Sequence, residues 1–289
     1  MSSLILGGVM LVYLAAGLLF LAAALRGTAP ALVGWGRSLL GAGLAAHTAA
    51  MLVRWWENYR LAIVHAASPD LGEQVRTLFL HPPLSNFYES LVFFSWCLPF
   101  MALTLFRRQR QPFLGVVVGL IASLLLAYAS LGVDSHIRPL MPALKSNWLL
   151  IHVITCFLGY AAFALAFGAA TLYLGQGRSR KPSAKLPSLA DLDRFIYQSV
   201  VLGFILLTLG ILTGAVWAES AWGRYWSWDP KETWSLITWL IYAALLHARL
   251  VKGWQGRRIA WLAVLGFAAV LFTYFGVSFL LPGLHSYLT

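Results

Sequence analysis

Four of the chain's seven histidines stand in or beside long apolar runs, where an imidazole ring could bind iron. His47 and His247 lie within two such runs, and His152 and His285 lie at the ends of two others. A histidine in or beside a membrane span is energetically costly, so it is a functional candidate by default. Two imidazoles on opposite faces can hold the iron of a porphyrin, and an apolar environment favours the neutral form that this requires. The four histidines therefore permit two axial pairs.

A second feature is a tryptophan-rich segment at about residues 217–234. Six of the 13 tryptophans lie between Trp217 and Trp239, in a short polar and aromatic stretch between two apolar runs. One or two of them could anchor the chain at a membrane interface. The density instead favours a flat apolar ligand, since indole faces can cover a macrocycle and Gly223 lets the backbone approach it closely. The candidate contact residues are Trp217, Trp222, Trp226, Trp228, Asp229 and Trp234.

Two cations in the same segment could pair with carboxylates of such a ligand. Arg224 and Lys231 are the candidates, because carboxylates on a macrocycle need cationic partners wherever the ring is held. The run from Asp229 to Glu232 also has the pattern of a helix start, with Asp as the cap, Pro at the first helical position and Glu three residues after the cap. We expect both interpretations to hold, with the cap fixing the loop beside the ligand.

The composition indicates the scaffold that must position these residues. The 289 residues are 60% hydrophobic and 11% charged, with a mean hydropathy of +0.75, which leaves too little polar surface for a soluble globule. The expected fold is an all-α integral membrane protein, a single helical domain over residues 1–289. The first apolar run lacks a basic leader and is too long for a secretory signal, so we expect it to stay in the mature protein. About eight transmembrane helices are predicted, at 3–25, 33–53, 87–106, 112–131, 147–174, 195–218, 232–251 and 259–281.

Lysine and arginine counts orient these spans. One set of alternate loops has net charge +12, while the other set, which includes the tryptophan-rich segment, has net charge −1. By the positive-inside rule the first set is cytoplasmic, so both termini and the tryptophan-rich segment are predicted to be outside. The net charge of +11 therefore reflects membrane topology, and no nucleic-acid partner is expected. Cys97 and Cys156 lie in separate apolar runs without a CxxC pair, and we expect buried, unreactive thiols.

The predicted topology divides the histidines into an outer and an inner pair. His152 and His285 share the outer side with the tryptophan-rich segment, so one ligand could lie between them. The alternative is that His152 only forms hydrogen bonds within the bundle and His285 is a solvated tail residue. His47 and His247 could form the inner pair, although they lie at different distances from the arginines that mark the inner ends of their spans. His81, at the head of the third span, is the alternative partner.

The sequence from Trp222 to Trp234, WGRYWSWDPKETW, resembles the tryptophan-rich WWD segment of the haem-handling proteins of cytochrome c biogenesis, in particular the CcsA/ResC branch. The likeness extends from about residue 47 to the end of the chain. It includes HPPLSNFYESLVFFSW (His81 to Trp96), LKSNWLLIHV (Leu144 to Val153) and GVSFLLPGLHSYL (Gly276 to Leu288).

The resemblance implies that His152 and His285 flank the WWD segment as ligands of an external haem, while His47 and His247 resemble the family's transmembrane ligands. It further implies the haem-delivering subunit of a system II cytochrome c synthase in the plasma membrane. Haem b, at one or two sites, would be presented at the outer face for thioether attachment to a CxxCH apocytochrome. The implied partners are apocytochrome c, a CcsB/ResB-like membrane subunit and a thioredoxin-like thiol reductant. The protein is expected to supply positioning and iron ligation within a haem lyase complex, and no residue is identified as catalytic.

Two other functions stay open at this point. A membrane haem chaperone of the CcmC type would share the tryptophan motif but would hand haem to another protein. A dihaem cytochrome b-like protein would use four histidines to carry electrons from quinol, although its histidines normally pair along two helices within the bundle. The second, membrane-embedded histidine pair favours the synthase.

Overall fold

The computed structural model describes residues 1–27, 29–64, 70–104, 112–137, 144–177 and 186–283, and helices dominate this part of the chain. The elements are α1 (Ser2–Arg26), α2 (Pro30–Val64), α3 (Leu71–Leu80), α4 (Phe87–Thr104), α5 (Pro112–Gly132), α6 (Asn147–Gln176), α7 (Leu189–Trp222), α8 (Pro230–Leu250), α9 (Arg257–Leu271), the π-helical turn η2 (Phe272–Gly276) and α10 (Val277–Leu280).

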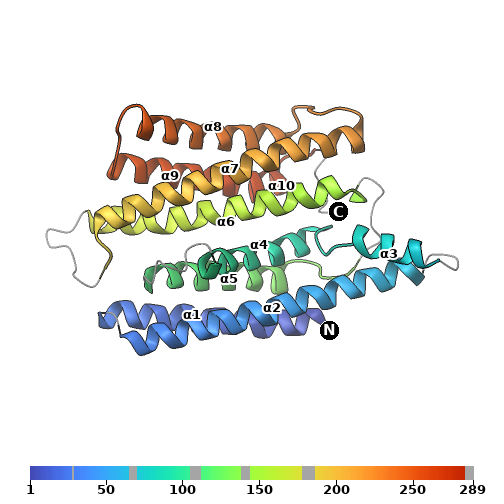
Figure 1. The fold of residues 1–289 in the computed structure, drawn as a ribbon, viewed down its shortest axis with the longest axis horizontal. Helices are drawn as coiled ribbons and strands as arrows, with labels where there is room; N and C mark the ends of the chain where they lie inside the picture. Colours follow the sequence, from blue (N-terminus) through green and yellow to red (C-terminus); the bar gives the residue numbers. More distant parts are fainter. Residues whose placement is uncertain (28, 65–69, 105–111, 138–143, 178–185, 284–289) are drawn as a thin grey trace.

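The long helices lie side by side along one axis and pack in two groups (Figure 1). The first group contains α1, α2, α4 and α5, and the second contains α6, α7, α8 and α9, which continues through η2 into α10. α6 joins the groups, because it packs against α4 on one side and against α7 and α9 on the other.

The helices confirm a multi-pass membrane protein. Six helical segments in the described part of the chain are long and apolar enough to cross a bilayer: α1, α4, α5, α6, α7 and the α9–α10 segment. The two remaining predicted spans correspond to α2 and α8, which lie in the same bundle but are less apolar. Each of them carries one of the histidines of the predicted inner pair, His47 in α2 and His247 in α8.

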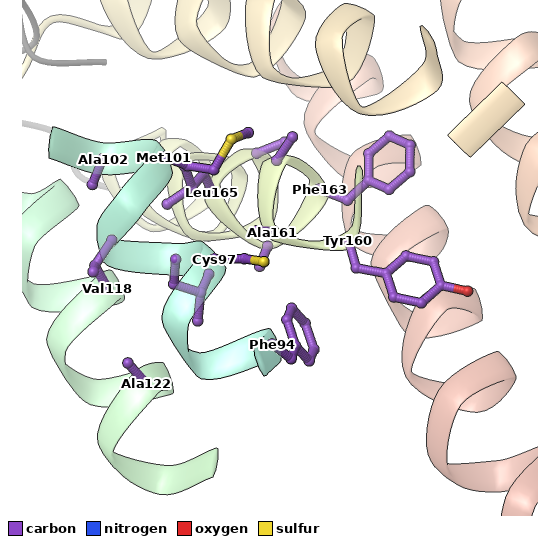
Figure 2. Close-up of a cluster of buried hydrophobic side chains, with 14 of the residues drawn as sticks. Phe94, Cys97, Met101, Ala102, Val118, Ala122, Tyr160, Ala161, Phe163 and Leu165 are labelled. Carbon is purple, nitrogen blue, oxygen red and sulfur yellow. The ribbon is translucent and has the colours of Figure 1, made fainter. Parts of the chain in front are cut away.

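Small residues on α6 allow its neighbours to pack closely around it. Ala161, Ala162, Ala164 and Ala166 are completely buried. Figure 2 shows Ala161 of α6 in one apolar cluster with side chains of α4 and α5. Close approach of backbones through small residues is the usual basis of helix packing in membranes. The two predicted buried cysteines are confirmed as free and buried.

The ends of the bundle differ in what they contain. The N-terminus, the start of α4, the α7–α8 loop and the end of α10 lie at one end (Figure 1). We call it the tryptophan end, and it is formed by residues 84–90, 147–156, 217–235 and 277–283. The α1–α2 and α8–α9 connections lie at the opposite end. Residues far apart in the sequence therefore meet at the tryptophan end.

Candidate functional site

A cavity of about 200 Å³ lies at the tryptophan end, between the two helix groups. Its walls come from residues 84–90, from the first half of α6, from the end of α7 with the following loop, and from the start of α8 together with η2 and α10. Pockets that enclose a whole drug-sized ligand have volumes of about 300–1,000 Å³. This cavity is smaller, so as it stands it could enclose only part of a macrocycle.

His152, in the second turn of α6, lines the cavity and is held against α7. Its Nδ1 lies 2.7 Å from the carbonyl oxygen of Gly210. Because a carbonyl oxygen only accepts, Nδ1 carries the hydrogen and Nε2 carries the lone pair that can bind a metal. The ring stacks on Trp217, with centroids 6.2 Å apart and planes at 13°. A Cβ at Gly214 would lie 2.5 Å from Nδ1, so glycine leaves the room that the ring needs.

The predicted tryptophans divide into three positions. Trp217 is 1% exposed and meets Trp222 edge-on, with centroids 4.7 Å apart. Trp226 lines the cavity and contacts Trp228 edge-on at 5.7 Å, while Trp228 itself is 68% exposed. Trp234 packs against η2 instead. The structure therefore places Trp217 and Trp226 in the cavity wall, Trp222 and Trp228 next to them, and Trp234 in a contact between helices.

The loop before α8 is fixed by the predicted helix cap. Asp229 accepts a hydrogen bond from the Lys231 backbone N–H at 2.9 Å, and Glu232 accepts from the backbone N–H groups of Ser227 at 2.7 Å and Asp229 at 3.2 Å. These bonds form a capping box with proline at the first helical position, which confirms the sequence prediction. Trp228 has a φ of 59°, an uncommon conformation for a residue other than glycine. The cap thus holds an indole-bearing loop in one shape.

The two predicted cations differ in position. Lys231 lines the cavity in the first turn of α8, just before the predicted span 232–251. Burial lowers the pKa of Lys231 to about 8, although the carboxylate of Asp229 acts in the opposite direction. Arg224 is exposed in the loop and is not part of the cavity wall. Lys231 is therefore the better placed of the two for a carboxylate inside the cavity.

The end of the described chain returns to this loop. A Cβ at Gly283 would collide with the carboxylate of Asp229 and would lie 3.1 Å from Pro230, so the chain after α10 passes directly over the start of α8. His285 lies outside the described residues.

The structure does not bring His47 and His247 together. α2 packs against α1, α3, α4 and α5, whereas α8 packs against α7, α9, η2 and α10, on the other side of the bundle (Figure 1). His47 is 0% exposed, its Nδ1 lies 3.2 Å from the Tyr13 hydroxyl, and its Nε2 has no hydrogen-bond partner among the described residues. His247 is exposed on α8. The two residues expected to pair thus lie on helices that are not neighbours, because depth in the membrane does not determine which helices pack together.

His81 also stays apart from the cavity wall. It follows α3, and its Nδ1 lies 2.7 Å from the carbonyl oxygen of Thr77 in that helix. This contact closes the end of α3 and gives no geometric support to His81 as an iron ligand.

Several cavity residues were not predicted from the sequence. Cys156 lies one turn after His152, with Sγ 3.7 Å from Nδ1, and the spacing of four on one helix could have indicated a shared face. Tyr274 of η2 lies with its hydroxyl 2.7 Å from Ser90 Oγ, and both residues line the cavity. A π-helical turn adds a residue to the helix and is often found at functional sites. No sequence pattern used above predicts such a turn.

The donor atoms suit a macrocycle that brings most of its own metal ligands. No group of three or more His, Cys, Asp or Glu side chains that could hold a metal ion occurs within the described ranges. The cavity instead offers one oriented imidazole, apolar and aromatic walls and one cation. This set fits haem, whose iron needs axial ligands and whose carboxylates need a positive partner.

The sequence is similar to that of known proteins over the whole of this site. A profile of the family described as "Cytochrome C assembly protein" matches residues 84–285, which include every wall of the cavity. The protein named "Cytochrome c biogenesis protein CcsA" of Guillardia theta is 44% identical over 229 residues, covering 71% of this chain and 76% of that protein. Its namesake in Prochlorococcus marinus (strain NATL2A) is 36% identical over 274 residues, covering 83% of this chain and 80% of that protein.

The helical arrangement is also similar to that of a solved structure. "Cytochrome c Heme Lyase CcmF" superimposes with a TM-score of 0.66 at 21% identity, covering 95% of this chain and 47% of that one. At this identity the likeness shows a shared fold, and this chain spans about half of the longer protein.

Proposed function

The chain belongs to the cytochrome c assembly family, among proteins of the CcsA type, and from this premise we propose that it binds haem at the tryptophan end and presents it for attachment to apocytochrome c. The observation that carries the proposal is the convergence of His152, Trp217, Trp226 and Lys231 on one cavity. These residues come from three helices and a loop, and nothing in a helix bundle alone requires them to meet.

Each of these residues has a distinct task. His152 offers Nε2 to iron, and the hydrogen bond from Nδ1 to Gly210 fixes the ring orientation and raises the basicity of the ligating nitrogen. Trp217 and Trp226 supply flat apolar surface that excludes water from the ring. Lys231 pairs with a propionate. Haem, when bound, supplies the iron and the vinyl groups to which the apocytochrome thiols add.

His285 is the second external ligand in this proposal. It follows Gly283 by two residues in the sequence, and Gly283 lies against the loop that carries the tryptophans. The partial enclosure expected from the cavity volume leaves one edge of the macrocycle open to a second protein. A site that holds haem only to pass it on requires such an open edge.

A second haem, if it is bound in the membrane, would involve His247 rather than His47. His247 is exposed on the surface of α8, whereas His47 is enclosed within the first helix group. The second protein ligand of that haem would then come from a membrane subunit of the CcsB/ResB type. The assembly would reside in the plasma membrane with the tryptophan end outside, in agreement with the loop charges of −1 and +12.

The test is covalent cytochrome c formation in cells that contain no other maturation system. His152→Ala should abolish thioether-linked haem on a CxxCH apocytochrome, and added imidazole should restore part of it by replacing the lost ligand. His136→Ala is the matched control, since His136 is exposed in the connection after α5 and does not line the cavity.

Attachment at the wild-type level in His152→Ala would refute the role of this site. Haem bound normally without any covalent product, even with the partner subunit present, would favour the CcmC-type chaperone. A dihaem cytochrome b-like protein would lose quinol oxidation in the histidine variants while c-type cytochromes still matured. The separation of His47 from His247 disfavours this last function, because these two histidines lie on helices that do not pack against each other.

A further inference from the structure

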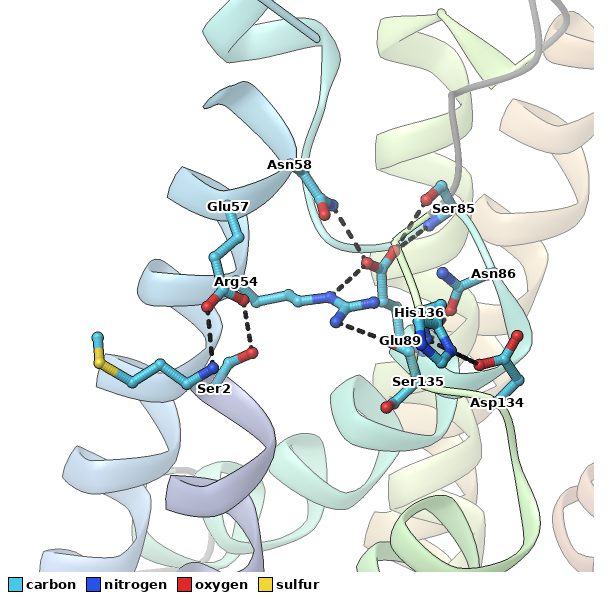
Figure 3. Close-up of polar contacts among 11 residues, drawn as sticks. Ser2, Arg54, Glu57, Asn58, Ser85, Asn86, Glu89, Asp134, Ser135 and His136 are labelled. Atoms are coloured by element: carbon cyan, nitrogen blue, oxygen red, sulfur yellow. Dashed lines mark hydrogen bonds and ion pairs between the residues drawn. The ribbon is translucent and has the colours of Figure 1, made fainter. Parts of the chain in front are cut away.

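One wall of the cavity is held from outside the cavity by a buried ion pair. Leu84, Ser85, Asn86, Phe87 and Ser90 line the cavity. Glu89, which lies among them in the sequence, is only 2% exposed and is directed toward α2 (Figure 3). The cavity-lining side chains and the Glu89 carboxylate therefore lie on opposite sides of residues 84–90.

The carboxylate of Glu89 closes the turn that forms this wall. Its Oε2 accepts hydrogen bonds from the backbone N–H of Ser85 at 3.0 Å and from the Ser85 hydroxyl at 2.8 Å. The backbone N–H of Glu89 donates to Asn86 Oδ1 at 2.8 Å. The position of Ser85 at the cavity thus depends on where the Glu89 side chain is held, while Asn86 closes the same turn through the Glu89 backbone.

Arg54 of α2 holds the carboxylate of Glu89 in place. Arg54 Nε donates to Glu89 Oε1 at 2.9 Å, and the two side chains are 7% and 2% exposed. Arg54 Nη1 donates to the carbonyl oxygen of Ser135 at 2.8 Å, which adds the segment after α5 to the same cluster. Asn58, one turn further along α2, donates to the same carboxylate oxygen at 3.1 Å. Figure 3 shows these contacts converging on Glu89 from α2 and from the wall segment.

Apolar side chains could stabilise the fold as well as this cluster of buried polar groups. Within the described chain, Arg54 Nη2 and Asn58 Oδ1 are buried without hydrogen-bond partners. Unpaired buried polar groups are costly, and a buried ion pair can often be replaced by apolar residues without loss of stability. Apolar residues could not reproduce the directional hydrogen bonds to Ser85.

We propose that Arg54 is a positioning residue for the cavity and that, through Glu89, it fixes the wall of residues 84–90 in the cavity that His152 also lines. The effect on the shape of the cavity rests on the contacts above alone. The consequence for haem binding rests, in addition, on the proposed function. Loss of Arg54 releases the turn at Ser85 and lets the cavity open.

A native cysteine reports this opening. Cys156 lines the cavity, whereas Cys97 is buried on α4 away from it. We would measure labelling of both thiols by N-ethylmaleimide in the haem-free full chain, using mass spectrometry to resolve the two sites. Arg54→Met should speed the labelling of Cys156 by at least about tenfold, which corresponds to roughly 1.4 kcal/mol less opening free energy. Cys97 should stay unlabelled.

Further variants separate the direct effect from unfolding. Glu89→Gln keeps an oxygen acceptor for Arg54 but replaces the acceptor of Ser85 by an amide nitrogen, so it should also speed Cys156 labelling. Arg54→Lys keeps one charged donor and should lie between wild type and Arg54→Met. Glu57→Gln is the matched control. Glu57 lies on α2 close to Arg54 but pairs with the N-terminal ammonium group and Ser2 instead of the wall.

Wild-type labelling of Cys156 in both Arg54→Met and Glu89→Gln would overturn the positioning role. Equal acceleration at Cys97 would also overturn it, because it would show general loosening of the bundle. Haem added to the wild type should protect Cys156, and the absorption spectrum of bound haem should change in Arg54→Met. If haem gives no protection while Arg54→Met still exposes Cys156, the proposed haem site fails and the positioning of the wall stands.

Discussion

The substitution Gly214→Ala should weaken haem binding by displacing His152, the proposed iron ligand. A Cβ at this position of α7 would lie 2.5 Å from Nδ1 and 2.7 Å from Cε1 of His152. Ordinary contact between such atoms requires about 3.5 Å. The ring must therefore move away from α7 by about 1 Å.

That movement breaks the hydrogen bond that orients the ligand. The bond from His152 Nδ1 to the Gly210 carbonyl oxygen is 2.7 Å long, and a shift of about 1 Å takes it beyond the ~3.2 Å limit for N–H···O bonds. Loss of an outer-shell partner of a metal-bound histidine typically weakens metal binding by about 10- to 100-fold. We expect Gly214→Ala to weaken haem binding within this range, and to reduce thioether formation at limiting haem.

The assay is titration of the haem-free protein with haem, followed by absorption, in Gly214→Ala and in the control Gly41→Ala. A Cβ at Gly41 of α2 would meet no atom within 4 Å, and both changes replace a helical glycine by alanine, which favours the helix by up to about 1 kcal/mol. Gly41→Ala should bind haem like the wild type. Equal affinity in all three proteins would refute the role assigned to the His152–Gly210 contact.

Two further predictions concern charge and the second histidine pair. Because the pKa of Lys231 is lowered to about 8, haem affinity should fall as the pH rises through about 8. Lys231→Gln should remove this pH dependence. Lys252→Gln, at an exposed lysine, should leave it in place. Burial disfavours the charged form of Lys231 in the folded state. The free energy of unfolding of the haem-free protein should therefore rise between pH 8 and roughly pH 10.4, which is the pKa of lysine in the unfolded chain. A flat profile would contradict the burial of this amine. In complexes with the partner subunit, His247→Ala should lower haem content while His47→Gln leaves it unchanged. The reverse result, measured by pyridine haemochrome, would restore His47 as the ligand.

The sequence alone indicated the membrane scaffold and the helix cap beside the cavity for physical reasons that can be stated. Apolar runs of about 20 residues have one stable form in a bilayer, so the six apolar spans could be predicted. The cap at Asp229 and Glu232 is a local pattern, and local hydrogen bonds are determined by sequence spacing. The position of Lys231 beside the tryptophans followed from the same short segment.

Contacts between distant segments could not be predicted in this way. The sequence could not show that His47 and His247 lie on helices that do not pack against each other, since a helix shows its depth in its sequence but not the identity of its neighbours. The hydrogen bond between Ser90 and Tyr274 joins residues 184 positions apart. The contact of Arg54 with Glu89 likewise depends on the packing of α2 against α4. The hydrophobic periodicity of a sequence does not predict which helices pack together.

The location of the cavity explains why residues remote from it could control it. Its walls are contributed by both helix groups, and α6 is the helix that packs against both. His152 and the tryptophans belong to the second group, while residues 84–90 belong to the first and are fixed there through Arg54. A change in the separation of the groups would therefore alter the width of the cavity. The Arg54–Glu89 pair joins α2 and the segment after α5 to this wall, so a change at either of them would reach the proposed haem site without contacting haem.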